Sequence, residues 1–253
     1  MKFFIINLEQ DIEKREKLTA LCESFGLDYE IISAVYGKAL SEDEINELVA
    51  PIEEQLKYLR KPLNRGEIGC SLSHKKCYEE IVKRDLKEAI ILEDDAIFNE
   101  ELIDFINSID KNLPSDLDLL LLGHYWQQYR DDGYTINTPY SLRYKKEISK
   151  WTIRKIIGRG NGTHGYYINK KGALKLLEKM KKIYIAADHY TSNTNYVNVY
   201  AIYPTVVNVD INFQSTINEN GIKKRSRFGK IIKTIKQKIL YFIPSLKKPK
   251  DYI

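Results

Sequence analysis

The stretch AIILEDDA (Ala89–Ala96) decides the fold class. Its first four residues are all apolar, which is typical of a central strand that is buried on both faces. Three acids, Glu93, Asp94 and Asp95, follow at once. Because side chains alternate along an extended chain, we expect Glu93 and Asp95 to point to one side of the sheet and Asp94 to the other.

Two carboxylates this close together repel each other unless a cation lies between them. Hard divalent ions such as Mg²⁺ and Mn²⁺ bind such pairs, usually together with substrate phosphates. In open α/β sheets, ligands lie beyond the carboxyl ends of the strands, where these acids fall. The pattern therefore predicts metal ligands at Glu93 and Asp95. The alternative is a structural role, with Asp94 as the N-cap of a helix that begins near Phe98.

The segments before this strand predict an α/β domain. Lys2–Leu8 is a compact apolar run, and Asp11–Phe25 places apolar residues at helical spacing. Gly26 then ends the helix, and Tyr29–Ala34 has the pattern of a second strand. This β-α-β order predicts a parallel sheet that is covered by helices on both faces.

The rest of the chain continues this alternation. Ser41 and Glu44 have the spacing of a capping box at the start of a helix. The pattern is weak between Pro51 and Arg65, where we expect a mobile connection, and a hairpin is one interpretation of residues 127–151. Helices are expected over 43–49, 68–85, 98–109 and 171–181, and strands over 118–122, 163–168 and 197–209.

The composition excludes several classes of protein. The chain has 253 residues, of which 43% are hydrophobic and 30% charged, as in folded globular proteins rather than disordered ones. Its three cysteines are odd in number and lack C-x-x-C spacing, which argues for reduced thiols and against a disulfide framework or a zinc site. No apolar run is long enough to span a membrane, and the start of the chain reads as a strand rather than a signal peptide.

The net charge of +5 is concentrated at one end of the chain. Residues 222–253 hold eleven Lys or Arg against one acid, which leaves 29 basic and 34 acidic residues in 1–221. A nucleic-acid-binding domain is therefore disfavoured. We expect a catalytic domain over 1–221 and a basic amphipathic tail over 222–253. Apolar residues at helical spacing between lysines are typical of a helix that lies on an anionic membrane surface, and the alternative is a helix packed on the domain.

Five segments of the chain together resemble glycosyltransferase family 25, which contains bacterial lipooligosaccharide galactosyltransferases and, more distantly, collagen galactosyltransferases. They are IINLEQDIEKR (Ile5–Arg15), LNRGEIGCSLSHKKCYEEI (Leu63–Ile81), IILEDDA (Ile90–Ala96), GTHGYYINKKGALKLL (Gly162–Leu177) and QSTI (Gln214–Ile217). The resemblance implies a GT-A type nucleotide-sugar fold with a mostly parallel central sheet, a UDP-sugar donor, a divalent metal and inverting transfer. Many GT-A enzymes carry Asp-x-Asp where this chain has Glu-Asp-Asp, and Glu93 and Asp95 occupy the outer positions.

The chemistry of such a transfer needs two further functions. A bound cation stabilises the diphosphate leaving group, and a base on the opposite face deprotonates the acceptor hydroxyl. Asp188, in IAADHYTSN, is the candidate base. The alternatives for Asp188 are a helix N-cap or, with His189, a place in the metal shell, and Glu67 is a weaker candidate base.

The remaining candidates concern the donor. In a GT-A fold Asn7 and Arg15 would lie where the uracil and ribose rest, although Arg15 has the alternative of a solvated helix charge. Spacing puts His74 and Tyr78 on one helix face, either as a donor-pocket wall or as a satisfied core histidine and its neighbour. Gly165 would let the backbone approach a sugar closely, and His124 is interpreted as structural. The full set of expected donor-binding residues is Asn7, Arg15, Ser73, His74, Tyr78, Asp94, His164 and Gly165.

Taken together with these patterns, the resemblance to family 25 implies a cytoplasmic, metal-dependent, inverting galactosyltransferase. It would move galactose from UDP-galactose to a terminal sugar of a lipid-linked oligosaccharide, as in lipopolysaccharide synthesis, at the inner face of a bacterial plasma membrane. One alternative keeps the fold and uses UDP-glucose or a UDP-N-acetylhexosamine. The other is a non-catalytic nucleotide-sugar-binding scaffold at the membrane, against which the intact acidic triplet argues.

Overall fold

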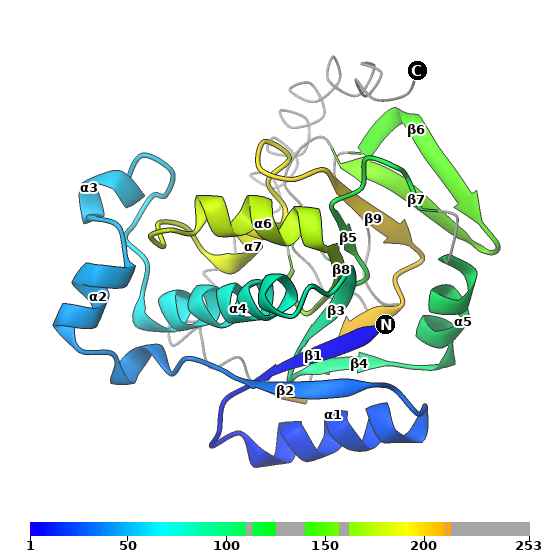
Figure 1. Cartoon of the computed structure of the whole chain (residues 1–253), viewed down its shortest axis with the longest axis horizontal. Coiled ribbons are helices and arrows are strands. Elements are labelled where there is room, and N and C mark those ends of the chain that lie inside the picture. The colour runs from blue at the N-terminus through cyan, green and yellow to red at the C-terminus, as the bar shows by residue number, and fades with distance from the viewer. Residues whose placement is uncertain (110–112, 125–139, 157–161, 211, 214–253) are drawn as a thin grey trace, which may run out of the picture.

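A computed structural model describes residues 1–109, 113–124, 140–156, 162–210 and 212–213 (Figure 1). Within these ranges the chain alternates between strands and helices, as the sequence predicts. In chain order the elements are β1 (Lys2–Asn7), α1 (Ile12–Ser24), β2 (Tyr29–Ser33), the 3-10 helix η1 (Gly37–Ala39), α2 (Glu42–Leu48), α3 (Ile52–Gln55), α4 (Arg65–Lys83), β3 (Glu88–Glu93), β4 (Ala96–Phe98), α5 (Glu100–Ile109), β5 (Leu119–Leu121), β6 (Tyr140–Ile148), β7 (Trp151–Ile156), β8 (Gly165–Asn169), α6 (Lys170–Lys179), α7 (Ala187–Thr191), β9 (Val199–Tyr203) and β10 (Val207–Val209).

The central sheet has eight strands in the order β2-β1-β3-β8-β5-β9-β7-β6. Strands β2, β1 and β3 are parallel, β8 is antiparallel to both β3 and β5, and β5 is parallel to β9. Strand β7 is antiparallel to β9 and β6. Six strands thus run in one direction and β7 and β8 in the other. The expected α/β fold with a helix-covered central sheet is confirmed, but the sheet is mixed because a reversed strand, β8, lies at its centre.

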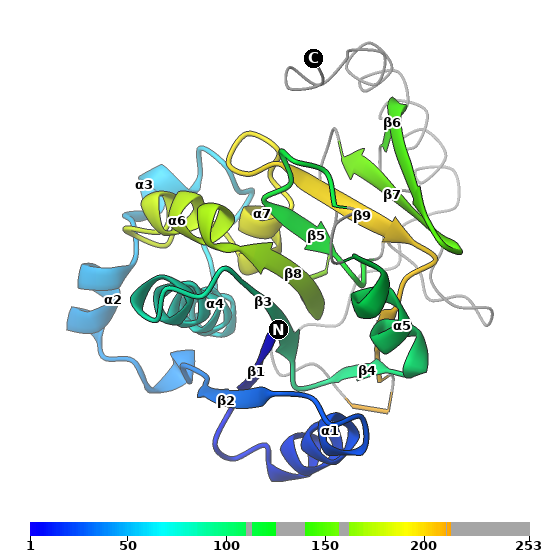
Figure 2. The ribbon, with the colours of Figure 1, turned by 45° about the vertical axis from the view of Figure 1, so that its right-hand side comes forward.

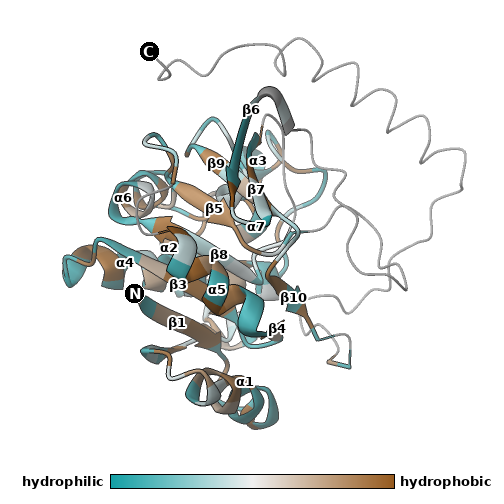
Figure 3. Ribbon diagram, turned by 90° about the vertical axis from the view of Figure 1, so that its right-hand side faces the viewer, coloured by the Kyte–Doolittle hydropathy of each residue, from teal (hydrophilic) through white to brown (hydrophobic). Residues whose placement is uncertain are grey.

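Helices cover both faces of this sheet, as Figure 2 shows, with α4 and α6 on one side and α1 and α5 on the other. Strand residues divide between two cores in alternation: Phe4 and Ile91 pack on the α4 side, whereas Phe3 and Ile90 pack on the α1 side. In Figure 3 the central strands β1 and β5 are mostly hydrophobic, while hydrophilic residues lie on the outer faces of the helices. This pattern is the one that predicts a strand buried on both faces.

Side-chain caps fix where several helices begin. Ser41 forms the predicted capping box with Glu44 at the start of α2, and Asn64 forms an equivalent box with Glu67 at the start of α4. Asn169 caps α6 by accepting a hydrogen bond from the backbone N–H of Gly172 at 2.8 Å. Among the described residues, every helix is too short or too polar to cross a bilayer.

Two expectations about individual segments need correction, and a third is confirmed. The connection after Pro51 contains α3 and is anchored by the buried side chain of Gln55, which bonds the backbone of Ala50 and Leu63 at 2.8 and 2.9 Å. The helix expected from Phe98 begins two residues later because β4 pairs with β10 in a small second sheet. Strands β6 and β7 form the hairpin that was one interpretation of residues 127–151. The 222–253 tail and QSTI lie outside the described residues.

Candidate active site

The three acids follow β3 directly and diverge to the two sides of the sheet. Glu93 continues the face of Ile91 and lies on the α4 side, whereas Asp94 turns to the α1 side and bonds Asn7. The predicted alternation is therefore confirmed for this pair. The carboxyl ends of β1 and β3 are neighbours in the parallel register, in which Ile6 lies opposite Glu93. This adjacency brings residues of the first β-α turn to the acids.

On the α4 side, Glu93 is held by an imidazole and a hydroxyl group. Its Oε1 lies 3.2 Å from Nε2 of His74 and accepts a hydrogen bond from Oγ1 of Thr163. Its backbone N–H donates to the carbonyl of His164 at 3.1 Å. Burial by itself raises the pKa of Glu93, but the hydrogen bond from His74, the positive charge of a protonated His74 and the hydrogen bond from Thr163 more than offset burial and hold that pKa below its ordinary value.

Two buried tyrosines extend this contact into the core. Nδ1 of His74 lies 2.7 Å from the hydroxyl of Tyr166, which lies 2.8 Å from the hydroxyl of Tyr78. All three side chains are fully buried, and burial raises the pKa of both tyrosines. Because an ionised Glu93 only accepts, Nε2 of His74 donates to it, and in a neutral imidazole this leaves Nδ1 to accept from Tyr166. His74 and Tyr78 do share one helix face, but they support Glu93 from behind rather than lining a pocket wall.

On the α1 side, Asp94 is held by a charged partner. Its Oδ1 accepts from Nζ of Lys14 at 3.2 Å and its Oδ2 from Nδ2 of Asn7 at 2.9 Å. Nη1 of Arg15 approaches Oδ1 of Asn7 at 3.5 Å and donates to the carbonyl of Glu9 at 3.2 Å. The structure thus brings together Asn7, Arg15 and Asp94, which the sequence predicts as donor-binding residues.

The alternative role of Asp94 as a helix cap is wrong. Helix α5 begins at Glu100, and the side chain of Asn99 accepts a hydrogen bond from the backbone N–H of Glu101 at 3.0 Å. The side chain of Asp94 therefore bonds residues on the α1 side of the site and does not cap α5.

Asp95 adjoins both Glu93 and Asp94, and only part of its hydrogen-bonding capacity is used. Its backbone carbonyl accepts from the N–H of Asp210 at 2.8 Å. Its side-chain Oδ1 is buried and has no hydrogen-bond partner among the described residues. Burial, with the nearby charges of Glu93 and Asp94, raises the pKa of Asp95 to about 7. A buried anionic oxygen that lacks a partner, beside a second carboxylate, fits a bound divalent cation.

A second arrangement of ligand atoms adjoins this one. One ligand atom from each of Cys70, His74 and Glu93 lies within 4.8 Å of the others. Carboxylate oxygens suit Mg²⁺ and Mn²⁺, whereas a cysteine sulfur suits softer ions such as Zn²⁺. The assignment of a metal to Glu93 and Asp95 stays a prediction.

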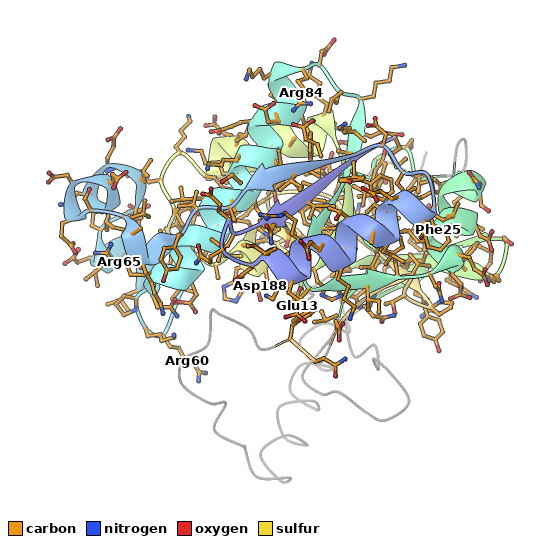
Figure 4. The ribbon with its side chains drawn as sticks, turned by 90° about the horizontal axis from the view of Figure 1, so that it is seen from below. Glu13, Phe25, Arg60, Arg65, Arg84 and Asp188 are labelled. Atoms are coloured by element: carbon orange, nitrogen blue, oxygen red, sulfur yellow. The ribbon has the colours of Figure 1, made fainter. Side chains whose placement is uncertain are left out.

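Asp188 lies in the short helix α7, which packs against α4. The N-cap of α7 is Ala186, so the interpretation of Asp188 as a cap is wrong. Burial is the main cause that raises its pKa, His189 opposes that rise and Glu93 adds to it. Figure 4 shows Asp188 with the side chains around it in a view from below. Glu67, the weaker candidate base, is instead used by the capping box of α4, where it accepts the backbone N–H of Asn64 at 2.8 Å.

Two further donor-site expectations have structural explanations. Oγ of Ser73 donates to the carbonyl of Gly69 at 2.7 Å and accepts from the N–H of Val35 at 2.8 Å, which ties α4 to the loop after β2. A Cβ on Gly165 would lie 2.5 Å from Cγ1 of Val207, so packing against β10 requires the glycine and not a sugar. Packing therefore explains the glycine, and the approach of a sugar to the Gly165 backbone stays a prediction.

The two buried histidines at this end of the sheet are core residues as well. His164 is 2% exposed and His124 is 1% exposed, and burial is the main cause that lowers the pKa of each to about 4. The backbone carbonyl of His164 accepts from the N–H of Glu93, and a contact of its side chain with the donor stays a prediction. His124 is structural, as expected, and Nε2 lies 3.2 Å from the carbonyl of Ile202.

Comparison with known proteins gives the family. A family model described as "Glycosyltransferase family 25 (LPS biosynthesis protein)" matches residues 1–191. The chain belongs to glycosyltransferase family 25. This confirms the family that the five sequence segments resemble, and the matched range contains every site residue described above.

Relatives in this family include animal proteins. Procollagen galactosyltransferase 1-A of Xenopus laevis is 31% identical over 179 residues, which is 69% of this chain and 27% of that protein. Procollagen galactosyltransferase 2 of Homo sapiens is 28% identical over 182 residues, or 70% and 27%, respectively. A glycosyltransferase 25 family member of Drosophila melanogaster is 31% identical over 183 residues, again 70% and 27%. The match thus covers about a quarter of the length of these curated relatives.

Among solved structures, a glycosyltransferase involved in the glycosylation of the major capsid of PBCV-1 has a TM-score of 0.31 and 11% identity. The similarity covers 71% of this chain and 62% of that one.

Proposed function

We propose that this family 25 member is a metal-dependent, inverting galactosyltransferase that uses UDP-galactose. The observation that carries the proposal is the acidic end of β3, where Asp95 has a buried oxygen without a partner among the described residues and Asp188 lies close enough to Glu93 for their charges to interact. Galactose is proposed because several relatives carry the name galactosyltransferase.

The three acids divide their roles by their partners. Lys14 neutralises Asp94. Among the described residues, Glu93 is bonded to His74 and Thr163 and has no lysine or arginine partner, and Asp95 has one oxygen without a partner. The uncompensated negative charge therefore belongs to Glu93 and Asp95, which would hold the cation. When bound, that ion would offset the charge of a UDP leaving group.

Asp188 would act as the general base on the opposite face of the sugar. Burial disfavours its charged form, so its carboxylate has a higher proton affinity than an exposed aspartate. The acceptor oxygen would form its bond to the anomeric carbon as the bond to UDP breaks, and the hydroxyl proton would pass to a carboxylate oxygen of Asp188. His189, whose Nε2 lies 3.9 Å from Oδ1 of Asp188, would steady the charged form.

The acceptor would be a terminal sugar of a lipid-linked oligosaccharide such as lipopolysaccharide. The description of the matching family as an LPS biosynthesis protein supports this part of the proposal. The basic amphipathic sequence of residues 222–253 would hold the enzyme at the anionic inner face of the plasma membrane, on its cytoplasmic side. A truncation after Gly221 would then keep its activity on a soluble acceptor but lose sedimentation with anionic liposomes.

Release of UDP from a panel of UDP-sugars tests the central proposal. UDP-galactose with Mn²⁺ should give the fastest release, and UDP-glucose or UDP-N-acetylhexosamines slower release. Excess EDTA should stop it. Equal turnover in EDTA would contradict the metal assignment, and binding of UDP-sugars without any turnover would favour the non-catalytic scaffold.

A further inference from the structure

Four tyrosines form a cluster beside α7, outside the site described so far. The ring centroids of Tyr58 and Tyr184 are 5.0 Å apart, those of Tyr184 and Tyr190 are 5.4 Å apart, and those of Tyr190 and Tyr196 are 6.3 Å apart. They come from the segment after α3, the segment before α7, α7 itself and the segment after it. We call these four residues the tyrosine platform.

The tyrosine platform is buried at Tyr190 and exposed to solvent at Tyr58. Tyr190 is fully buried, and its hydroxyl accepts a hydrogen bond from the backbone N–H of Tyr184 at 3.1 Å. The hydroxyl of Tyr184 donates to that of Tyr196 at 3.0 Å. Tyr58 covers this arrangement at the surface and is 48% exposed. Within the described part of the chain, the hydroxyl of Tyr58 has no partner and that of Tyr196 has no acceptor for its own proton.

The strand-like segment that carries Tyr184 also leads to the candidate base. The residues before and after Tyr184 are both hydrogen-bonded through their backbone. The carbonyl of Ile183 accepts from the N–H of Ala50 at 2.8 Å, and the carbonyl of Ile185 accepts from Oγ of Ser71 at 3.3 Å. Asp188 is the fourth residue after Tyr184, so their Cα atoms are at most about 14 Å apart. This places the platform within reach of a second sugar when the first lies at Asp188.

The platform lies on the α4 side of the sheet, because Tyr190 belongs to the core on that side and Tyr184 and Tyr196 pack against it. The donor candidates Asn7, Arg15 and Asp94 belong instead to the α1 side of the sheet. The platform therefore adjoins the acceptor half of the site and not the donor half.

We infer that the tyrosine platform binds a sugar ring of the acceptor, next to the ring that receives the transferred sugar. A tyrosine ring offers an apolar face to the C–H face of a sugar, and its hydroxyl bonds the hydroxyls of that sugar. Tyrosine also loses little side-chain entropy on binding because it has only two χ angles. This inference rests on the proposed function, since it extends the acceptor side of that site.

The test uses two soluble acceptor probes that differ by one sugar, octyl β-galactoside and octyl β-lactoside. Binding is followed by saturation-transfer NMR with UDP and Mn²⁺ present, and transfer by UDP release. Because the octyl chain is common to both probes, the difference between them reports on the second sugar. The wild-type protein should bind the lactoside more tightly than the galactoside.

Tyr58→Ala should remove that preference. We expect the affinity for the lactoside to fall by about three- to tenfold and its KM to rise by the same factor. The kcat, the KM for UDP-galactose and the affinity for the galactoside should stay unchanged. Tyr203→Ala is the matched control, because Tyr203 is 56% exposed at the end of β9, outside the platform. Tyr196→Phe, which removes one hydroxyl and keeps the ring, should give a smaller loss of the same kind.

Three results would overturn the inference: equal affinity of the wild-type protein for both probes, an unchanged lactoside affinity in both Tyr58→Ala and Tyr196→Phe, or the same loss in Tyr203→Ala. Failure of the proposed function has a different signature, in which the wild-type protein releases no UDP from any UDP-sugar while these binding differences persist.

Discussion

The two sides of the sheet hold neighbouring carboxylates in opposite ways. On the α4 side, a chain of hydrogen bonds from Tyr78 through Tyr166 and His74 reaches Glu93. On the α1 side, the ammonium group of Lys14 bonds Asp94 directly. Hydroxyl and imidazole groups fix the carboxylate of Glu93 without a lysine or arginine, whereas Lys14 places a permanent positive charge against Asp94. Adjacent acids can therefore serve different purposes.

The largest effect is expected from Asp95, which lies between the two sides. Asp95→Asn removes one of the two charges that would hold the cation, so turnover should fall about 1,000-fold because charge stabilisation of the leaving group is lost. Mn²⁺ binding, measured by electron paramagnetic resonance, should weaken in parallel while the circular dichroism spectrum stays unchanged. Asp94→Asn is the matched control and should lose less than about tenfold, because the charge of Asp94 is already cancelled. Equal losses in both variants would remove the distinction between the two sides.

A smaller loss is expected from Asp188, which belongs to the α4 side. Asp188→Asn should lower the transfer rate by about 100-fold, the usual contribution of a general base, with UDP-galactose affinity nearly unchanged. Because burial raises the pKa of Asp188, the rate should fall on acidification at a pH above the ordinary pKa of an aspartate. The pH-rate profile of kcat/KM checks this. Loss of donor binding in the variant would make Asp188 a ligand of the metal or the donor.

Much of this arrangement could be predicted from the sequence, because its signals are local. A four-residue apolar run predicts the buried strand, and two-residue periodicity predicts that Glu93 and Asp94 diverge. The partners of Glu93 could not be predicted in the same way. Thr163 and Tyr166 precede or enter β8, whose insertion beside β3 depends on the pairing of distant strands. The reversed direction of β8 has no local signal either.

Local sequence patterns could not predict the contacts of Gly165 and Lys14, because residues that are distant along the chain make those contacts. Gly165 has the pattern of a glycine at a ligand site, yet the side chain that requires it is Val207, which is far along the chain. Lys14 precedes Arg15 on an exposed helix, so its contact with Asp94 could not be distinguished from solvation before the fold was known. Long-range packing decides both cases.

Tyr166→Phe tests whether the hydrogen-bonded side chains of Tyr78, Tyr166 and His74 hold Glu93 in its orientation. The substitution keeps the ring in the core but leaves Nδ1 of His74 and the hydroxyl of Tyr78 without their shared partner. Leaving buried polar groups unsatisfied should cost about 1–3 kcal/mol of unfolding free energy. Turnover should fall about tenfold because His74 no longer holds Glu93 in one orientation. Urea unfolding and steady-state kinetics measure the two effects. The control is Tyr167→Phe, which removes a 2.6 Å hydrogen bond from the Tyr167 hydroxyl to Glu88 that is not connected to Glu93.

The smallest effect on turnover is expected from Lys14, and it tests the opposite side. Lys14→Met keeps the apolar stem and removes the ammonium group, leaving Asp94 as a largely buried carboxylate that is 13% exposed and retains only Asn7. An unpaired buried charge is costly, so unfolding free energy should fall by about 2 kcal/mol, while turnover changes less than about threefold. Lys181→Met, which removes an ion pair with Glu178 between side chains that are 71% and 63% exposed, is the control and should lose less than about 1 kcal/mol. In the double variant Lys14→Met with Asp94→Asn, part of the lost stability should return, because an amide needs no counter-ion. If the double variant is instead as unstable as the sum of the single changes, the lysine does not act by cancelling the charge of Asp94, and the contrast between the two sides of the sheet has another cause.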